Sequence, residues 1–133
     1  QKEASTVGLT KDRVVEYSQA WRAMSTGAES FVNSRGAFPS VVPSWDNSAR
    51  RKSGSFIFHN STPEEYALWL RKEISGVQSR PQDQRLVFLN AWNEWAEGNH
   101  LEPDQRWGRA YLEATRKVVT GQPIQPPHTA PLS

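Results

Sequence analysis

The chain has 133 residues, of which 36% are hydrophobic and 23% charged, with a net charge of +2 and no cysteine. This composition predicts a globular domain, excludes disulfides and thiol catalysis, and gives no indication of a nucleic-acid partner, because the only basic cluster is Arg50-Arg51-Lys52. No apolar run approaches the roughly 18 residues that a membrane helix needs, so we expect no membrane span.

The first predicted element is a helix that begins after Thr10, a residue type favoured at N-caps, and ends near Gly27. Its apolar positions recur at helical spacing, at Val14, Tyr17, Trp21 and Met24. We interpret this stripe as a core-packing face.

A strand with proline at its edges is predicted from Gly36 to Val42, and Phe56-Ile57-Phe58 predicts a shorter extended segment. The loop between them offers an indole, a carboxylate, an amide and a guanidinium, on Trp45, Asp46, Asn47 and Arg50. Arg50 either binds substrate and keeps a glutamate ionised, or forms an ion pair with Asp46 that only shapes the loop. The position of this loop after a strand favours the binding role.

A second helix is predicted to begin at Thr62-Pro63-Glu64-Glu65, where Thr62 can cap, Pro63 suits the first position and Glu65 completes a capping box. One face of it is apolar, at Tyr66, Trp69, Leu70, Ile74 and Val77. A buried strand, Arg85 to Leu89, follows.

The segment Asn90 to Asp104 after that strand holds four carboxylates, two tryptophans and a histidine, without a lysine or arginine. Glu94 and Glu97 are three residues apart, and two like charges held close push their pKa values apart, so that one acts as acid and the other as base in glycoside chemistry. Sugar rings stack on indoles, and amide or imidazole groups bind hydroxyls. The predicted binding residues here are Trp92, Asn93, Trp95, His100 and Glu102.

Each of these residues alone is more often a solvated acid or a core aromatic. The cluster as a whole, directly after a strand, favours a sugar site. His59 and His100 lack spaced partners, so we expect no metal and no cofactor. His100 is expected to form a hydrogen bond within its own loop.

The last predicted helix has its apolar positions at Trp107, Ala110, Tyr111, Ala114 and Val118 and runs until Gly121. Residues 122–133 contain four prolines and predict a disordered tail. The expected organisation is therefore a domain of residues 1–121 and a tail of residues 122–133, with an α/β order of elements.

Three stretches of the sequence, Phe38-Pro39, Pro43 to Arg51 and Asn90 to Asp104, resemble the C-terminal part of the WbsX-type glycosyltransferases. Those proteins look like glycoside hydrolase family 99, the endo-α-mannosidase family. The resemblance runs from about Val14 to Val119. It implies a (β/α)8 barrel of TIM type that transfers or cleaves glycosyl units in bacterial surface polysaccharides such as the O-antigen of lipopolysaccharide. It also implies a cytoplasmic protein, at most peripheral to a membrane.

The match to the hydrolase motif falls on six residues, Asn93, Glu94, Glu97, Gly98, Glu102 and Pro103. In that family the first glutamate is thought to deprotonate the sugar's own 2-hydroxyl and the second to protonate the leaving oxygen. By resemblance, Glu94 is the base and Glu97 the acid. The mannosidases commonly have histidine where this chain has Ala96, which puts a mannosidase substrate in doubt but not the glycan class.

A (β/α)8 barrel takes about 250 residues, so 133 residues form at most its C-terminal part. We therefore expect the N-terminal half to be missing, the fragment to be inactive alone and its uncovered faces to favour self-association. Within the fragment, the strands at Ala37 and Leu86 are expected to be parallel. The alternative function is a non-catalytic glycan-binding module or a remnant of such an enzyme.

Overall fold

The structure is a computed structural model that describes residues 11–124, without the side chains of residues 27–35. The helices of this part are α1 (Tyr17–Arg35), α2 (Pro63–Val77) and α3 (Ala110–Val119). The strands are β1 (Arg13–Glu16), β2 (Ser40–Val41), β3 (Phe56–His59), β4 (Phe88–Leu89), β5 (Asn93–Glu94) and β6 (Asn99–His100). Helix α1 follows β1, and α2 follows the two strands β2 and β3; the strands form three two-stranded sheets.

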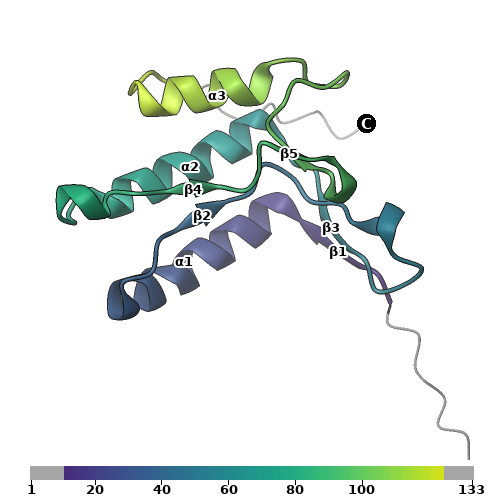
Figure 1. Ribbon diagram of the computed structural model, residues 1–133, viewed down its shortest axis with the longest axis horizontal. Helices are drawn as coiled ribbons and strands as arrows, with labels where there is room; N and C mark the ends of the chain where they lie inside the picture. The colour runs from purple at the N-terminus through teal and green to yellow at the C-terminus, as the bar shows by residue number, and fades with distance from the viewer. Residues whose placement is uncertain (1–10, 125–133) are drawn as a thin grey trace, which may run out of the picture.

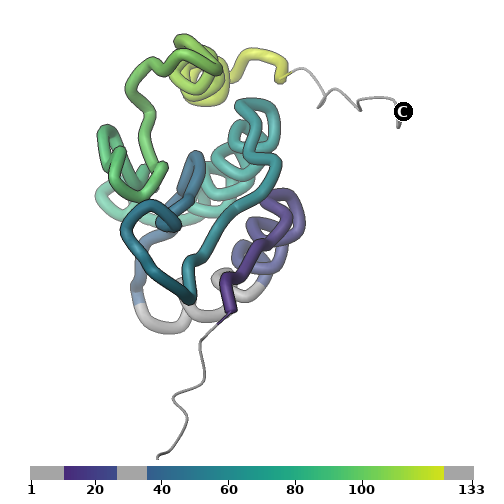
Figure 2. The backbone as a smooth tube through the Cα atoms, turned by 90° about the vertical axis from the view of Figure 1, so that its right-hand side faces the viewer, coloured from purple at the N-terminus to yellow at the C-terminus, as the bar shows by residue number. Residues whose placement is uncertain are grey.

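The three helices lie side by side, with α2 between α1 and α3 (Figure 1). Seen along the helices, the strands and the loops that follow β2 and β4 lie together on one side of this helical layer (Figure 2). The core is formed where the layers meet, chiefly by Tyr17, Trp21, Val41, Tyr66, Trp69, Leu70, Leu101, Tyr111, Ala114 and Val118. Most of the apolar positions predicted for the second and third helices are therefore buried, but Trp107 precedes α3 instead of lying in it and is only partly buried.

The predicted first helix was partly wrong. Val14 lies in β1, where it pairs in parallel with Ile57 of β3, and the helix begins only at Tyr17. Two β-branched residues in succession, Val14 and Val15, favour a strand once β3 offers a partner. The helix also continues past Gly27 to Arg35, and it ends at Gly36, whose positive φ of 65° suits a glycine C-cap. Thr10 lies outside the described residues.

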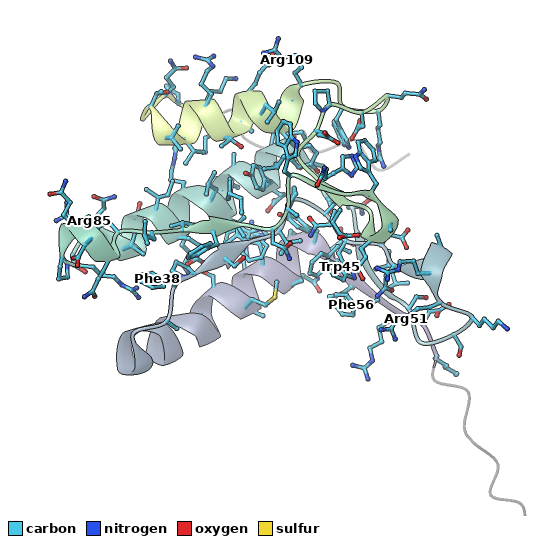
Figure 3. All side chains as sticks on the ribbon, in the orientation of Figure 1. Phe38, Trp45, Arg51, Phe56, Arg85 and Arg109 are labelled. Atoms are coloured by element: carbon cyan, nitrogen blue, oxygen red, sulfur yellow. The ribbon has the colours of Figure 1, made fainter. Side chains whose placement is uncertain are left out.

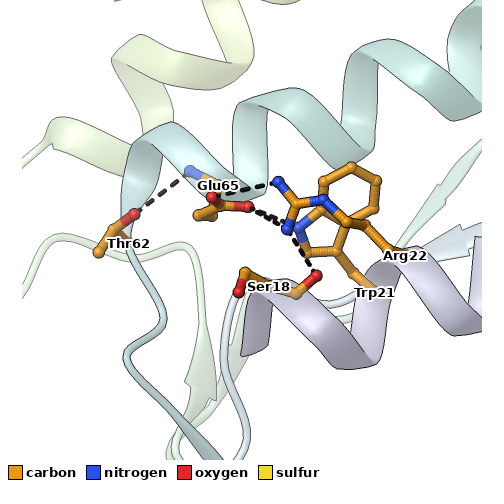
Figure 4. Close-up of polar contacts among 5 residues, drawn as sticks. All are labelled: Ser18, Trp21, Arg22, Thr62 and Glu65. Atoms are coloured by element: carbon orange, nitrogen blue, oxygen red, sulfur yellow. Dashed lines mark hydrogen bonds and ion pairs between the residues drawn. The ribbon is translucent and has the colours of Figure 1, made fainter. Parts of the chain in front are cut away.

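Helix α2 begins as predicted. The Thr62 hydroxyl accepts a hydrogen bond from the Glu65 amide at 3.2 Å, and Pro63 occupies the first turn. The Glu65 carboxylate, however, contacts α1. It accepts a hydrogen bond from the Trp21 indole at 2.7 Å and forms an ion pair with Arg22 at 3.2 Å (Figure 4). A residue predicted as half of a capping box thus fastens two helices together.

Strands β2 and β4 are parallel, as predicted for the Ala37 and Leu86 segments, with Ser40 opposite Phe88 and Val41 opposite Leu89. Both strands are shorter than the predicted ranges. Because two neighbouring strands run in the same direction, the loops that follow them emerge at the same end of the sheet. The candidate site was predicted at this end of the sheet.

The described residues form no barrel, so the barrel fragment expected from the resemblance is not confirmed; the observed mixture of helices and short parallel pairs is compatible with an α/β fold. Most of the predicted tail, from residue 125 onward, lies outside the described residues. Within the described part, no helix combines the length and apolar character that crossing a membrane requires.

Candidate functional site

The loop after β2 and the loop after β4 are joined through their backbones. The Asp46 amide donates to the Glu97 carbonyl at 2.8 Å, and the Ser44 hydroxyl donates to the Gly98 carbonyl. The packing is so close that a Cβ on Gly98 would lie 3.2 Å from both the Cβ and the amide nitrogen of Asp46. Trp45 marks this junction in Figure 3, where side chains of both loops converge.

An ion pair crosses the same junction. Arg50 Nη1 lies 3.0 Å from Glu97 Oε1, with side-chain exposures of 55% and 24%. Asp46 instead accepts a bond from the Ser48 amide at 2.9 Å. The structure therefore pairs Arg50 with a predicted catalytic glutamate and not with Asp46, and the predicted role of Arg50 in binding substrate stays a prediction.

Asn47 has a structural contact rather than an open amide. Its side chain is 6% exposed, and its Oδ1 accepts the Phe56 amide at 2.8 Å, which fixes the start of β3 against the loop. A buried amide whose oxygen is used in this way holds the backbone of the site. Its predicted role in binding substrate remains untested.

The sequence did not predict the hairpin that carries the two glutamates. Glu94 lies in β5 and is paired with Asn99 of β6, rather than at the end of the preceding strand. The residues between the strands, Trp95–Glu97, form a single 3-10 turn that Gly98 closes with a φ of 56°. A glycine in the left-handed region between two short strands is a known hairpin signal, and Glu97-Gly98-Asn99 contains it.

Both tryptophans of the hairpin are half exposed, Trp92 at 52% and Trp95 at 49%. Trp95 is held in place, since its Nε1 donates to Glu102 at 2.6 Å and its ring stacks on His100 with centroids 3.6 Å apart. A fixed, exposed indole next to carboxylates is a surface on which a sugar ring can stack. Glu94 and Asn93 are also exposed on this hairpin.

His100 forms its hydrogen bond within the same loop, as expected, with Nε2 3.0 Å from Asp104 Oδ2. The other oxygen of Asp104 accepts the Trp107 amide at 2.6 Å. Burial alone would raise the pKa of Asp104, but the bonds from the Trp107 amide and His100 outweigh it and lower that pKa below the usual value. Asp104 was not among the predicted site residues, although it closes the glutamate segment.

We expect Asp104→Asn to lower the free energy of unfolding by about 1.5–3 kcal/mol at pH 7, the range for a hydrogen bond to a charged group. The folded-state pKa of Asp104 is depressed, so its stabilising effect is present above the unfolded value of about 3.9 and disappears as the pH falls through the folded value. Denaturant unfolding at pH 7 and pH 3 measures this. An equal difference between the two proteins at both pH values would contradict it.

No group of three or more histidine, aspartate or glutamate side chains within residues 11–124 has the arrangement of a metal site. What the site offers instead is a set of carboxylates, an arginine and two exposed indoles, contributed by two loops that touch. Such a set can bind hydroxyl-rich rings and transfer protons.

Comparison with known proteins gives a consistent result. A family model described as "Glycosyltransferase WbsX" matches residues 1–115. Two curated proteins, both described as uncharacterized protein WxcX and from two strains of Xanthomonas campestris pv. campestris, are 45% identical to this chain over 87 residues. That region is 65% of this chain but 12% of each relative, so the chain spans a small part of their length. No solved structure matches the chain.

Proposed function

The chain belongs to the WbsX glycosyltransferase family, and from that premise we propose that it supplies the paired-glutamate site of an enzyme that transfers or cleaves glycosyl units. Family membership points to bacterial polysaccharide biosynthesis, and we propose O-antigen-like surface polysaccharide as the product or substrate. The observation that supports this best is the junction of the two loops, where Arg50 reaches Glu97 beside the exposed indoles.

In this proposal Glu94 removes a proton from the sugar and Glu97 donates one to the leaving oxygen. The hydrogen bond from Asp46 to the Glu97 carbonyl fixes the backbone that carries the acid. We propose that a bound substrate draws Arg50 away from Glu97, which frees that carboxyl group to face the leaving oxygen.

We further propose that the described elements are part of a (β/α)8 barrel in the full-length protein. Parallel sheets in proteins are usually covered on both faces and contain more than two strands. Here the apolar side chains of Phe88 in β4 and of Leu86 just before it are 56% and 46% exposed, and Phe38, whose ring lies against that of Phe88, is 39% exposed. Missing strands and helices would cover this surface, and without them we expect the isolated chain to self-associate.

A second function is supported by the tryptophans alone. Indoles that are half exposed and fixed in position are sufficient to bind a glycan without breaking any bond. The second candidate is therefore a glycan-binding module, or a remnant of an enzyme that retains binding.

Binding of saccharide should depend on Trp95. Titration of bacterial surface oligosaccharides should shift tryptophan fluorescence with millimolar affinity, or about 4 kcal/mol, because stacking on one exposed indole is weak. Trp95→Ala should weaken this response, while Phe38→Ala, which removes an exposed ring elsewhere, should not. Unchanged binding by Trp95→Ala would exclude this indole as a sugar platform, and binding without turnover in the full-length protein would favour the module.

A further inference from the structure

One face of the Trp95 indole is already covered by the protein. The ring of His100 stacks on it, with centroids 3.6 Å apart and the two planes at 17°. The indole Nε1 donates to Glu102 at 2.6 Å, so the edge of the ring that carries the donor is occupied as well. Trp95 is nevertheless 49% exposed. The face opposite His100 is therefore the part of this indole on which a ligand can pack.

The imidazole that supports this ring is itself held in place. His100 Nε2 lies 3.0 Å from Asp104 Oδ2, and the two side chains are 14% and 17% exposed. The other oxygen of Asp104 accepts the Trp107 amide at 2.6 Å, which ties the carboxylate to the backbone of the following loop. A carboxylate bonded to one ring nitrogen sets the tautomer and the orientation of a histidine. Asp104 thus fixes the ring on which Trp95 rests.

Glu102 holds the nitrogen edge of the indole from a backbone that is also fixed. Its amide and that of Leu101 both donate to the Trp92 carbonyl, at 3.0 and 2.9 Å. Its carboxylate is a charged acceptor, and a hydrogen bond to a charged acceptor is stronger than one between neutral groups. Trp95 is therefore supported on one face by His100 and at its nitrogen by Glu102.

We propose that Asp104 and Glu102 are positioning residues, which act on a bound saccharide through Trp95 and do not contact it themselves. His100 passes the effect of Asp104 to the indole by stacking. Both His100 and Glu102, which were predicted to bind substrate directly, then act from behind the ring. A side chain that is already ordered binds more tightly, because binding does not have to order it. That the ligand is a saccharide rests on the proposed function.

The alternative is direct contact between these polar groups and the ligand. Trp95, His100 and Asp104 all line an open hollow beside the indole, from which a ligand would meet their polar atoms directly. The low exposure of the His100 and Asp104 side chains favours the positioning role. Conservative substitutions separate the two roles, because each can keep the support of the ring while it removes the group that a sugar hydroxyl would bind.

The first test is a saturation-transfer NMR titration of the full-length protein with methyl glucopyranoside and methyl mannopyranoside. His100→Ala and Glu102→Ala should each weaken binding about two- to tenfold, the effect of losing one aromatic or hydrogen-bonded support. His100→Phe keeps a ring for stacking and Glu102→Gln keeps an oxygen acceptor for the indole, so both should recover most of the affinity. Losses as large in these two variants as in the alanine variants would establish direct contact and overturn the proposal.

The second test needs no ligand. The indole N–H resonance of Trp95 is the one that disappears from the NMR spectrum of Trp95→Ala. In Asp104→Ala and in Glu102→Ala it should move toward the position of a solvent-exposed indole. These shifts without any saccharide binding would support the positioning of the ring and count against the proposed function. An unchanged Trp95 resonance in Asp104→Ala would overturn the positioning role whether or not a saccharide binds.

Asp12→Ala is the matched control for loss of a bonded carboxylate. Hydrogen bonds from the hydroxyl and the amide of Ser55 lower the pKa of Asp12, and the amide lies 2.8 Å from Asp12 Oδ1. The substitution therefore removes a comparable anchor at the start of β1, away from the hairpin. It should leave the Trp95 resonance and saccharide binding unchanged. Equal shifts of that resonance in Asp12→Ala and Asp104→Ala would mean that general destabilisation moves the indole, which contradicts the proposal.

Discussion

Replacing Glu94 or Glu97 by glutamine in the full-length protein should lower turnover of a glycan substrate by about 10²–10⁴-fold, the usual contribution of general acid or base catalysis. Glutamine keeps the shape of the side chain but neither carries the charge nor transfers the proton. The loss of turnover should have a different cause in the two variants. Glu97→Gln also removes the partner of Arg50 across the loop junction, whereas Glu94 is exposed on β5.

Stability is the first control, because removal of charged groups from an active site typically leaves the melting temperature equal or higher. Glu113→Gln is the matched control, since Glu113 is an exposed acid on α3. It should retain full activity. Turnover like that of the wild type in both Glu94→Gln and Glu97→Gln would remove these residues from catalysis.

Gly98→Ala is expected to have the largest effect on stability near the site. Gly98 has a φ of 56°, which costs an alanine about 1–2 kcal/mol, and the added Cβ would lie 3.2 Å from backbone and side-chain atoms of Asp46. Relief of that contact must separate the two loops, at a further cost of about 1–3 kcal/mol. Because the loops hold Arg50 against Glu97, glycan turnover should fall as well.

Gly121→Ala provides the comparison. Gly121 has a φ of 70° but nothing within 4 Å of an added Cβ, so it reports the cost of the backbone conformation alone. Chemical denaturation of both variants should show that Gly98→Ala is the less stable one, by the free energy needed to relieve the contact between the added Cβ and Asp46. Equal destabilisation by the two substitutions would mean that the close approach of Asp46 to Gly98 does not hold the loops together.

Local signals in the sequence predicted α2 and the parallel pairing of β2 with β4. Thr62 and Pro63 specify a helix start through groups within one turn, so no distant partner is needed. The first helix could not be placed in the same way. Val14 lies at helical spacing from Tyr17, but it is also β-branched. It adopts the strand because Ile57 of β3 lies opposite it as a pairing partner.

The candidate site shows the same division between local and distant information. That the loops of Arg50 and Glu97 meet follows from two parallel strands, which the sequence indicated. That Arg50 pairs with Glu97 rather than Asp46 depends on the hairpin turn at Gly98, which was missed.

A structure of the full-length protein with a bound oligosaccharide tests the central claim, the glycan site at the loop junction, most directly. We expect a sugar ring stacked on Trp95 or Trp92, with Arg50 released toward the ligand. The carboxylates of Glu94 and Glu97 should lie about 2.6–3.2 Å from a ring hydroxyl and the glycosidic oxygen. A saccharide bound in the protein's catalytic cleft with both carboxylates out of its reach would contradict the account.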